Sequence, residues 1–164
     1  MKTLLNRLHR LHDQFFGYIS YLKSPFLLFV RLYWGLQLAR NGWAKLHNPS
    51  NVTDFFTSLH SPAPGVTALV ISSLEFFGGI LLALGLFSRI IALMLTVNLI
   101  VAYIVADSEA LHAIFSDPDK FMAAAPFNFL MASLIILIFG PGLFCVDEVL
   151  RRLFGWNSSK TSTP

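Results

Sequence analysis

The sequence contains a single cysteine, Cys145, and few charged residues. One cysteine can form neither an internal disulfide nor the dithiol pair that a thiol oxidoreductase cycles. Charged residues make up only 13% of the 164 residues and hydrophobic residues 55%, whereas a soluble domain carries about a quarter charged residues. These shortages argue against a soluble protein and a self-contained thiol enzyme, and they predict a single membrane domain.

Motifs for the common cofactors are also missing. The chain has no glycine-rich phosphate loop, so binding of flavin or nicotinamide is not expected,. None of the five histidines lies in an apolar segment, which disfavours a membrane haem. His47, His60 and His112 fall on one side of the expected membrane, but their spacings match no compact zinc motif. We therefore expect ordinary loop histidines, no metal and no covalently bound cofactor.

Long apolar stretches are what the sequence does contain. A membrane-spanning helix needs about 20 mostly apolar residues. Four segments qualify, some of them short or interrupted by a charge: 25–46, 66–87, 90–106 and 121–146. Because only Ser88 and Arg89 separate the second from the third, these two should form a tight antiparallel hairpin. The sequence predicts an all-α fold, an integral membrane four-helix bundle, over residues 24–150.

Two flanking regions differ from this domain. Residues 1–23 place apolar side chains at spacings of three and four among basic residues, which predicts an amphipathic helix in the headgroup plane. A helix packed on another protein is the alternative. Residues 151–164 form a polar tail that we expect to be cytoplasmic and partly disordered.

The distribution of basic residues predicts the topology. With both termini cytoplasmic, eight basic residues lie on the inner side and three on the outer side. The inner residues are Lys2, Arg7, Arg10, Lys23, Arg89, Arg151, Arg152 and Lys160, and the outer ones are Arg40, Lys45 and Lys120. We therefore expect a multi-pass protein with both termini inside.

Two ionisable residues, Arg31 and Glu75, lie clearly inside apolar segments. Each costs at least about 2.5–3.5 kcal/mol at the centre of a bilayer, so each should face the interior and have partners. A rise of about 1.5 Å per residue puts Glu75 at the depth of three polar residues. These are Gln37, Arg40 and Tyr103. Arg31 lies nearer the inner side, from where it could reach Asn98 or Glu75.

Two interpretations of this cluster stay open. Glu75 and an arginine form a buried ion pair that fixes the register of the helices, or the cluster binds a polar headgroup or relays a proton. In the second case Glu75 is the candidate proton relay. The candidate ligand-binding residues are Arg31, Gln37, Arg40, Lys45, Asn98 and Tyr103. For the glycines at 35, 42, 78, 79 and 85, close helix packing is the favoured interpretation. Cys145, beside Asp147 and Glu148, is expected to be an inert packing residue.

Three stretches resemble the DoxX family of small four-helix membrane proteins. They are RLYWGLQLARNGWAKL from Arg31, LEFFGGILLALGLFSRIIALML from Leu74 and NFLMASLIILIFGPGLFCVDEVL from Asn128. The shared positions are Arg31, Gly42, Lys45, Glu75, Gly78, Gly79, Gly85, Arg89, Gly140, Pro141, Gly142 and Asp147. The resemblance extends over about residues 25–150.

This resemblance implies a location in a bacterial-type plasma membrane and a link to quinones, because the family takes its name from a subunit associated with thiosulfate:quinone oxidoreductase. The chain itself has no electron source, so it would be the membrane half of a quinone-linked redox or oxidative-stress complex. A soluble partner on the cytoplasmic face would bring the electrons. Two alternatives are a non-catalytic membrane anchor and an oligomeric permeation unit for a small molecule or protons. Nucleic acid is not an expected partner.

Overall fold

The computed structural model describes residues 2–153, without the side chains of residues 2–20 and Arg152. The described chain forms eight α-helices and no strand. They are α1 (Lys2–His47), α2 (Pro49–Ser58), α3 (Pro64–Leu84), α4 (Ser88–Val105), α5 (Ser108–His112), α6 (Pro118–Ala123), α7 (Pro126–Phe139) and α8 (Val146–Leu153). The predicted tail from residue 154 onward lies outside the described residues.

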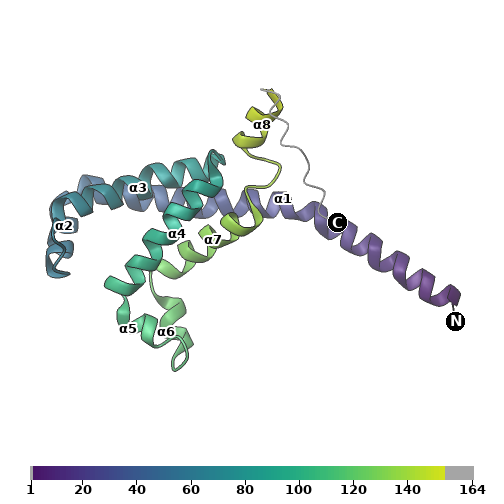
Figure 1. Ribbon diagram of the computed structural model, residues 1–164, viewed down its shortest axis with the longest axis horizontal. Helices are drawn as coiled ribbons and strands as arrows, with labels where there is room; N and C mark the ends of the chain where they lie inside the picture. The colour runs from purple at the N-terminus through teal and green to yellow at the C-terminus, as the bar shows by residue number, and fades with distance from the viewer. Residues whose placement is uncertain (1, 154–164) are drawn as a thin grey trace.

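Helix α1 is longer than the first predicted segment. It continues through Pro25, so the predicted N-terminal helix and the first apolar segment form one helix, which extends to the N-terminal end in Figure 1. Pro25 removes one backbone hydrogen bond but does not end the helix. The amphipathic pattern of residues 1–23 stays a prediction, because their side chains, apart from residues 21–23, lie outside the described residues.

The long helices pack as two pairs. Helix α1 packs along α3, and α4 packs along α7, while α3 and α4 make fewer contacts with each other. In Figure 1 the two pairs converge near the α3–α4 turn and separate toward α2 on one side and α5 and α6 on the other. The predicted α3–α4 hairpin is therefore correct in its short turn, but each helix packs mainly on a helix distant in sequence.

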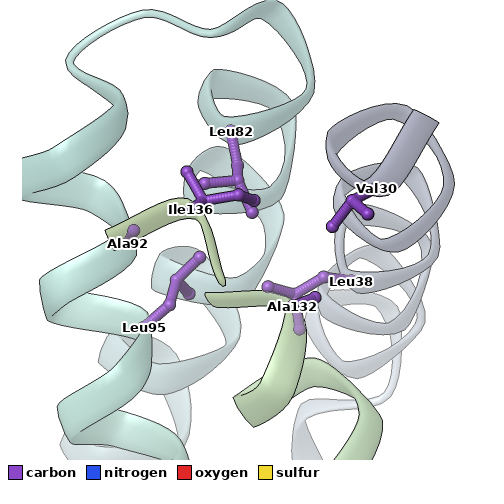
Figure 2. Packing of buried hydrophobic residues seen from close by; sticks show 7 residues of the cluster. All are labelled: Val30, Leu38, Leu82, Ala92, Leu95, Ala132 and Ile136. Atoms are coloured by element: carbon purple, nitrogen blue, oxygen red, sulfur yellow. The ribbon is translucent and has the colours of Figure 1, made fainter. Parts of the chain in front are cut away.

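The two pairs share one apolar core near the place where they converge. Figure 2 shows residues from all four long helices meeting there, with Leu82, Leu95 and Ile136 almost completely buried. Leu82 belongs to α3, Leu95 to α4 and Ile136 to α7, so one cluster joins both pairs. Burial of apolar side chains at this point fixes one end of each pair and leaves the other ends free to diverge.

Glycines allow α1 and α3 to approach closely. A Cβ atom built on Gly79 would lie 2.5 Å from the Ala39 nitrogen and 2.6 Å from the Gly35 oxygen. One built on Gly42 would lie 2.8 Å from the Ser72 oxygen. These atoms belong to the backbone and cannot move aside. The predicted packing role is therefore confirmed for Gly35, Gly42 and Gly79.

The fourth predicted segment, 121–146, is wrong in its extent. Its continuous part is α7, with 14 residues. Pro126 begins this helix, and Gly140 and Gly142 leave it through positive φ angles of 77° and 79°. These are backbone conformations that glycine adopts without strain.

The segment after α7 returns to the α3–α4 turn. The Asp147 carboxylate accepts hydrogen bonds from Phe87 N at 2.8 Å, Ser88 N at 3.1 Å and Ser88 Oγ at 3.2 Å. Its own backbone N–H donates to the Gly85 oxygen at 3.1 Å. A carboxylate at this position satisfies the free N–H groups at the start of α4 and complements the helix dipole. These hydrogen bonds thus join the start of α8 to the α3–α4 turn, at the end of the molecule opposite to α2.

The crossing of α1 and α3 can be tested with alanine at Gly79. We expect Gly79→Ala to lower the free energy of unfolding in detergent by about 1–3 kcal/mol through backbone overlap, although alanine is the better helix former. Gly65→Ala is the matched control, because a Cβ built on Gly65 meets nothing within 4 Å. Equal stability of the two variants would contradict the close crossing.

Candidate functional site

The carboxylate Glu75, which lies within the apolar helix α3, is paired with Lys45. The Lys45 Nζ atom donates to both Oε1 and Oε2 of Glu75, each at 2.7 Å. The side chain of Glu75 is only 8% exposed and that of Lys45 is 40% exposed. The ammonium group therefore faces open space on one side while it neutralises a nearly buried carboxylate on the other.

The helix crossing explains why these two residues meet. Gly42 packs directly on the backbone of α3 at Ser72 and Phe76. Lys45 follows Gly42 by three residues and so lies on the same face of α1, one turn further along. Glu75 is likewise three residues after Ser72, on the face of α3 that meets α1. The close backbone contact thus brings the stems of both side chains within reach of one ion pair.

The ion pair lines a cavity of about 390 Å³ between α2, α3 and α4. Its apolar wall is formed by Phe55 and Phe56 of α2, Ile71 of α3 and Val101 and Val105 of α4. The cavity lies on the α2 side of the molecule, where the two helix pairs diverge (Figure 1). The spreading of the pairs and the covering helix α2 together create this space.

Polar groups are few and come from four different segments. Lys45 and Glu75 are joined by Asn98 of α4 and by His60, Ser61 and Thr67 near the start of α3. The half-buried Asn98 makes no side-chain hydrogen bond to any described residue, so its amide is free to donate and to accept. Ser61 and Thr67 bond each other at 3.1 Å. An apolar space with a few convergent polar groups is the usual form of a small-molecule site.

Gln37 and Arg40 do not join Glu75, contrary to the prediction. Both line a shallow hollow made by α1 alone, on another face of that helix, and Arg40 is exposed. The rise per residue gives the depth of Gln37 and Arg40 in the membrane, but it does not give the direction of their side chains around the helix axis. Lys45, five residues beyond Arg40, points to α3 instead.

Tyr103 also lies apart from Glu75. Its ring is 2% exposed and stacks on Phe121 with 5.0 Å between ring centroids. Its hydroxyl donates to the Phe121 oxygen at 2.9 Å. Tyr103 does not line the cavity that contains Glu75, and its hydrogen bond ties α4 to α6.

Arg31 reaches neither Asn98 nor Glu75. It is completely buried at the opposite end of the molecule, where its Nη2 donates to the Phe144 oxygen. The guanidinium group holds the segment after α7 against α1. Cys145 is buried in the same segment and donates to the Gly142 oxygen at 3.2 Å.

Sequence reasoning missed α2 and with it His60, Phe55 and Phe56. A signal was present: Pro49 opens the helix, a position that suits proline, and Val52, Phe55, Phe56 and Leu59 follow at helical spacing. The segment is too short to span a membrane, so a search for membrane-spanning helices does not find it. In the described part of the chain, no three His, Cys, Asp or Glu side chains form a group that could hold a metal ion.

The family comparison covers this site. The DoxX family model matches residues 26–108, just over half of the chain. The chain belongs to the DoxX family. The matched region contains Lys45, His60, Glu75 and Asn98. It ends before α6, so it does not include the resembling stretch from Asn128 to Leu150. Neither the curated proteins nor the solved structures include a match to this chain.

Membership in DoxX agrees with the composition of the helices. Helices α3 and α4 are long and apolar enough to cross a membrane, and α7 is a shorter apolar helix. This DoxX protein is therefore a membrane protein that contacts lipid. Its exposed apolar side chains, such as Leu69, Phe77 and Ile104, fit a lipid environment,.

The ion pair can be tested by removing one or both partners. Lys45→Met leaves the nearly buried carboxylate without its partner. We expect it to lower the free energy of unfolding by about 1–3 kcal/mol, less than for a fully buried pair because Lys45 is partly exposed. The double variant Lys45→Met/Glu75→Leu should recover most of this loss. Chemical unfolding in detergent measures both, and a double variant no more stable than Lys45→Met would contradict the pairing.

Proposed function

We propose that this DoxX protein binds a quinone-type amphiphile in the Lys45–Glu75 cavity and serves as the membrane subunit of a quinone-linked redox complex. The observation that supports this most is the combination of an apolar, partly aromatic wall with an ion pair and a free amide. The volume of about 390 Å³ is within the range of about 300–1,000 Å³ that is usual for small-molecule sites,.

The polar groups suit a ligand without net charge. Lys45 and Glu75 neutralise each other, so an anion or a cation would have to compete with an ion pair already formed. A lysine ammonium has three donors, and two suffice for the carboxylate oxygens. The third can donate to a ring carbonyl. The Asn98 amide can donate to a carbonyl or accept from the hydroxyl of the reduced form. Glu75 can relay a proton to the ring oxygen as the electrons of the partner reduce the quinone to the quinol.

Electrons would come from a second protein. The sequence offers no cysteine pair and no flavin or nicotinamide motif. A soluble partner would therefore carry the redox centre and would have to bring it close to the cavity, and this chain would supply the quinone site and the proton path. If the cavity binds no ligand, the protein is better explained as an anchor for such a partner. If Glu75 titrates without a ligand in an oligomer, it is better explained as a permeation unit.

We also propose the orientation of the chain in a bacterial-type plasma membrane. Helices α1, α3, α4 and α7 would cross it with both termini inside, which places the cavity near the outer face and the basic Arg89 turn inside. Helix α7 would need its flanking segments to complete the crossing. Fusions of a cytoplasmic and a periplasmic reporter enzyme to the C-terminus test this, and activity of the periplasmic fusion alone would contradict it.

Ligand binding can be tested with a decyl-substituted benzoquinone in detergent or nanodiscs. We expect Asn98→Leu to weaken binding about 5- to 30-fold, which corresponds to one lost hydrogen bond and an apolar group in its place. Arg40→Ala and Tyr103→Phe are the controls, since neither residue lines the cavity. Binding is measured by fluorescence quenching or by native mass spectrometry.

Decylbenzene, which has the same tail and no oxygen, should not compete with the benzoquinone. Equal binding by the wild type and Asn98→Leu, or a loss of binding in Arg40→Ala, would exclude the cavity as the quinone site. Co-purification of a soluble protein without any quinone would favour the anchor instead.

A further inference from the structure

The turn after α2 has an unusual residue at its strained position. His60 adopts a φ of 56°, in the left-handed region. Its N–H donates to the Thr57 oxygen at 3.0 Å, and the N–H of Ser61 donates to the Phe56 oxygen at 3.1 Å. These two bonds define a Schellman motif, whose left-handed position is usually glycine because a side chain there strains the backbone.

The same kind of helix end elsewhere in the chain uses glycine. At the end of α3, Gly85 has a φ of 74°, and its N–H and that of Leu86 both bond to the Leu81 oxygen. Histidine at position 60 thus departs from the residue that the backbone favours and that the chain uses for α3. Backbone strain of this kind is concentrated at functional sites, where the side chain itself is needed.

The side chain of His60 lies at the rim of the cavity. It is exposed, and it lines the same space as Lys45, Glu75 and Asn98. The charged groups of that space are Lys45 from α1 and Glu75 from α3; α2 and α4 contribute none to its lining. Because Lys45 and Glu75 bond each other, the imidazole is the titratable group of the lining that has no bonded partner there.

The cavity is polar at two separate levels. One level contains His60, Ser61 and Thr67, and the other contains Lys45, Glu75 and Asn98. Thr67 precedes Glu75 by eight residues on α3, which corresponds to about 12 Å along the helix axis. The wall between the two levels is apolar and includes Ile71. A ligand that satisfies both levels needs one oxygen group toward Lys45 and Asn98 and another toward His60.

We propose that His60 is a specificity-determining residue of the cavity, which binds the second oxygen of an uncharged ring ligand whose first oxygen faces Lys45 and Asn98. This inference rests on the proposed quinone site and adds to it the ligand class: rings with two separated oxygen groups, as in a para-quinone or its quinol. A neutral imidazole can donate to a carbonyl through one ring nitrogen or accept from a hydroxyl through the other. The protein thus tolerates a strained backbone at position 60 because the imidazole is needed at the rim of the cavity.

The test uses a substitution that relieves the backbone strain. His60→Gly should leave the melting temperature unchanged or raise it, because glycine adopts the left-handed conformation freely. It should weaken binding of the decyl-substituted benzoquinone about 5- to 30-fold through the lost hydrogen bond. Binding of 4-decylphenol, which has a single oxygen, should stay within about twofold of the wild type. His60→Asn should recover part of the benzoquinone affinity, since asparagine tolerates this backbone and keeps a polar amide.

Phe87→Gly is the matched control. Phe87 is the other non-glycine residue with a positive φ in the described part of the chain, at 49°, and it does not line the cavity. Its replacement relieves the same kind of strain without any expected effect on binding. The comparison of the two variants separates the effect of the turn from that of the imidazole.

Four results would overturn the inference. A wild-type benzoquinone affinity in His60→Gly, or an equal loss of benzoquinone and decylphenol binding, removes the specificity role alone and leaves the quinone site in place. A large fall in the melting temperature of His60→Gly shows a structural role instead. A wild-type protein that binds neither compound contradicts the proposed function as well.

Discussion

The backbone contact between α1 and α3 is the constraint on which the rest of the structure depends. Gly35, Gly42 and Gly79 remove the side chains that would hold the two helices apart. Only at this short distance can Lys45 reach both oxygens of Glu75. The ion pair then keeps a carboxylate stable within apolar surroundings, where an unpaired one would be costly. The ion pair therefore depends on the helix packing, because a bulkier residue at position 42 would separate the two helices that carry Lys45 and Glu75.

The cavity follows from what happens on either side of that crossing. At one end, the core around Leu82, Leu95 and Ile136 and the Asp147 hydrogen bonds hold the two helix pairs together. At the other end the pairs diverge in Figure 1, and residues of α2, α3 and α4 line the cavity there. The fold thus combines a closed end, which supplies stability, with an open end, which contains the cavity that we propose as the binding site. The unpaired Asn98 amide and the strained His60 both belong to the open end.

Much of the fold could be predicted from the sequence, since apolar length and turn residues locate α3 and α4 within a few positions. The membership in the DoxX family and the packing role of the glycines between α1 and α3 could also be predicted. The partner of Glu75 could not be predicted, because the rise along a helix gives depth but no direction around the axis. Arg40 has a similar depth to Glu75 but points away from it. Helix α2 and His60 were missed for another reason. A ten-residue amphipathic helix resembles a link when only segments long enough to cross a membrane are sought.

The central claim is that the Lys45–Glu75 cavity, and no other surface of the protein, holds the ligand. Photocrosslinking with an azido derivative of the decyl-substituted benzoquinone, followed by peptide mass spectrometry, tests it most directly. The predicted adducts lie in residues 55–62 of the α2 turn and 98–106 of α4, which line the cavity from opposite sides. Unlabelled benzoquinone should suppress them. Adducts confined to residues 32–44 of α1, the face that carries Gln37 and Arg40, would contradict the claim.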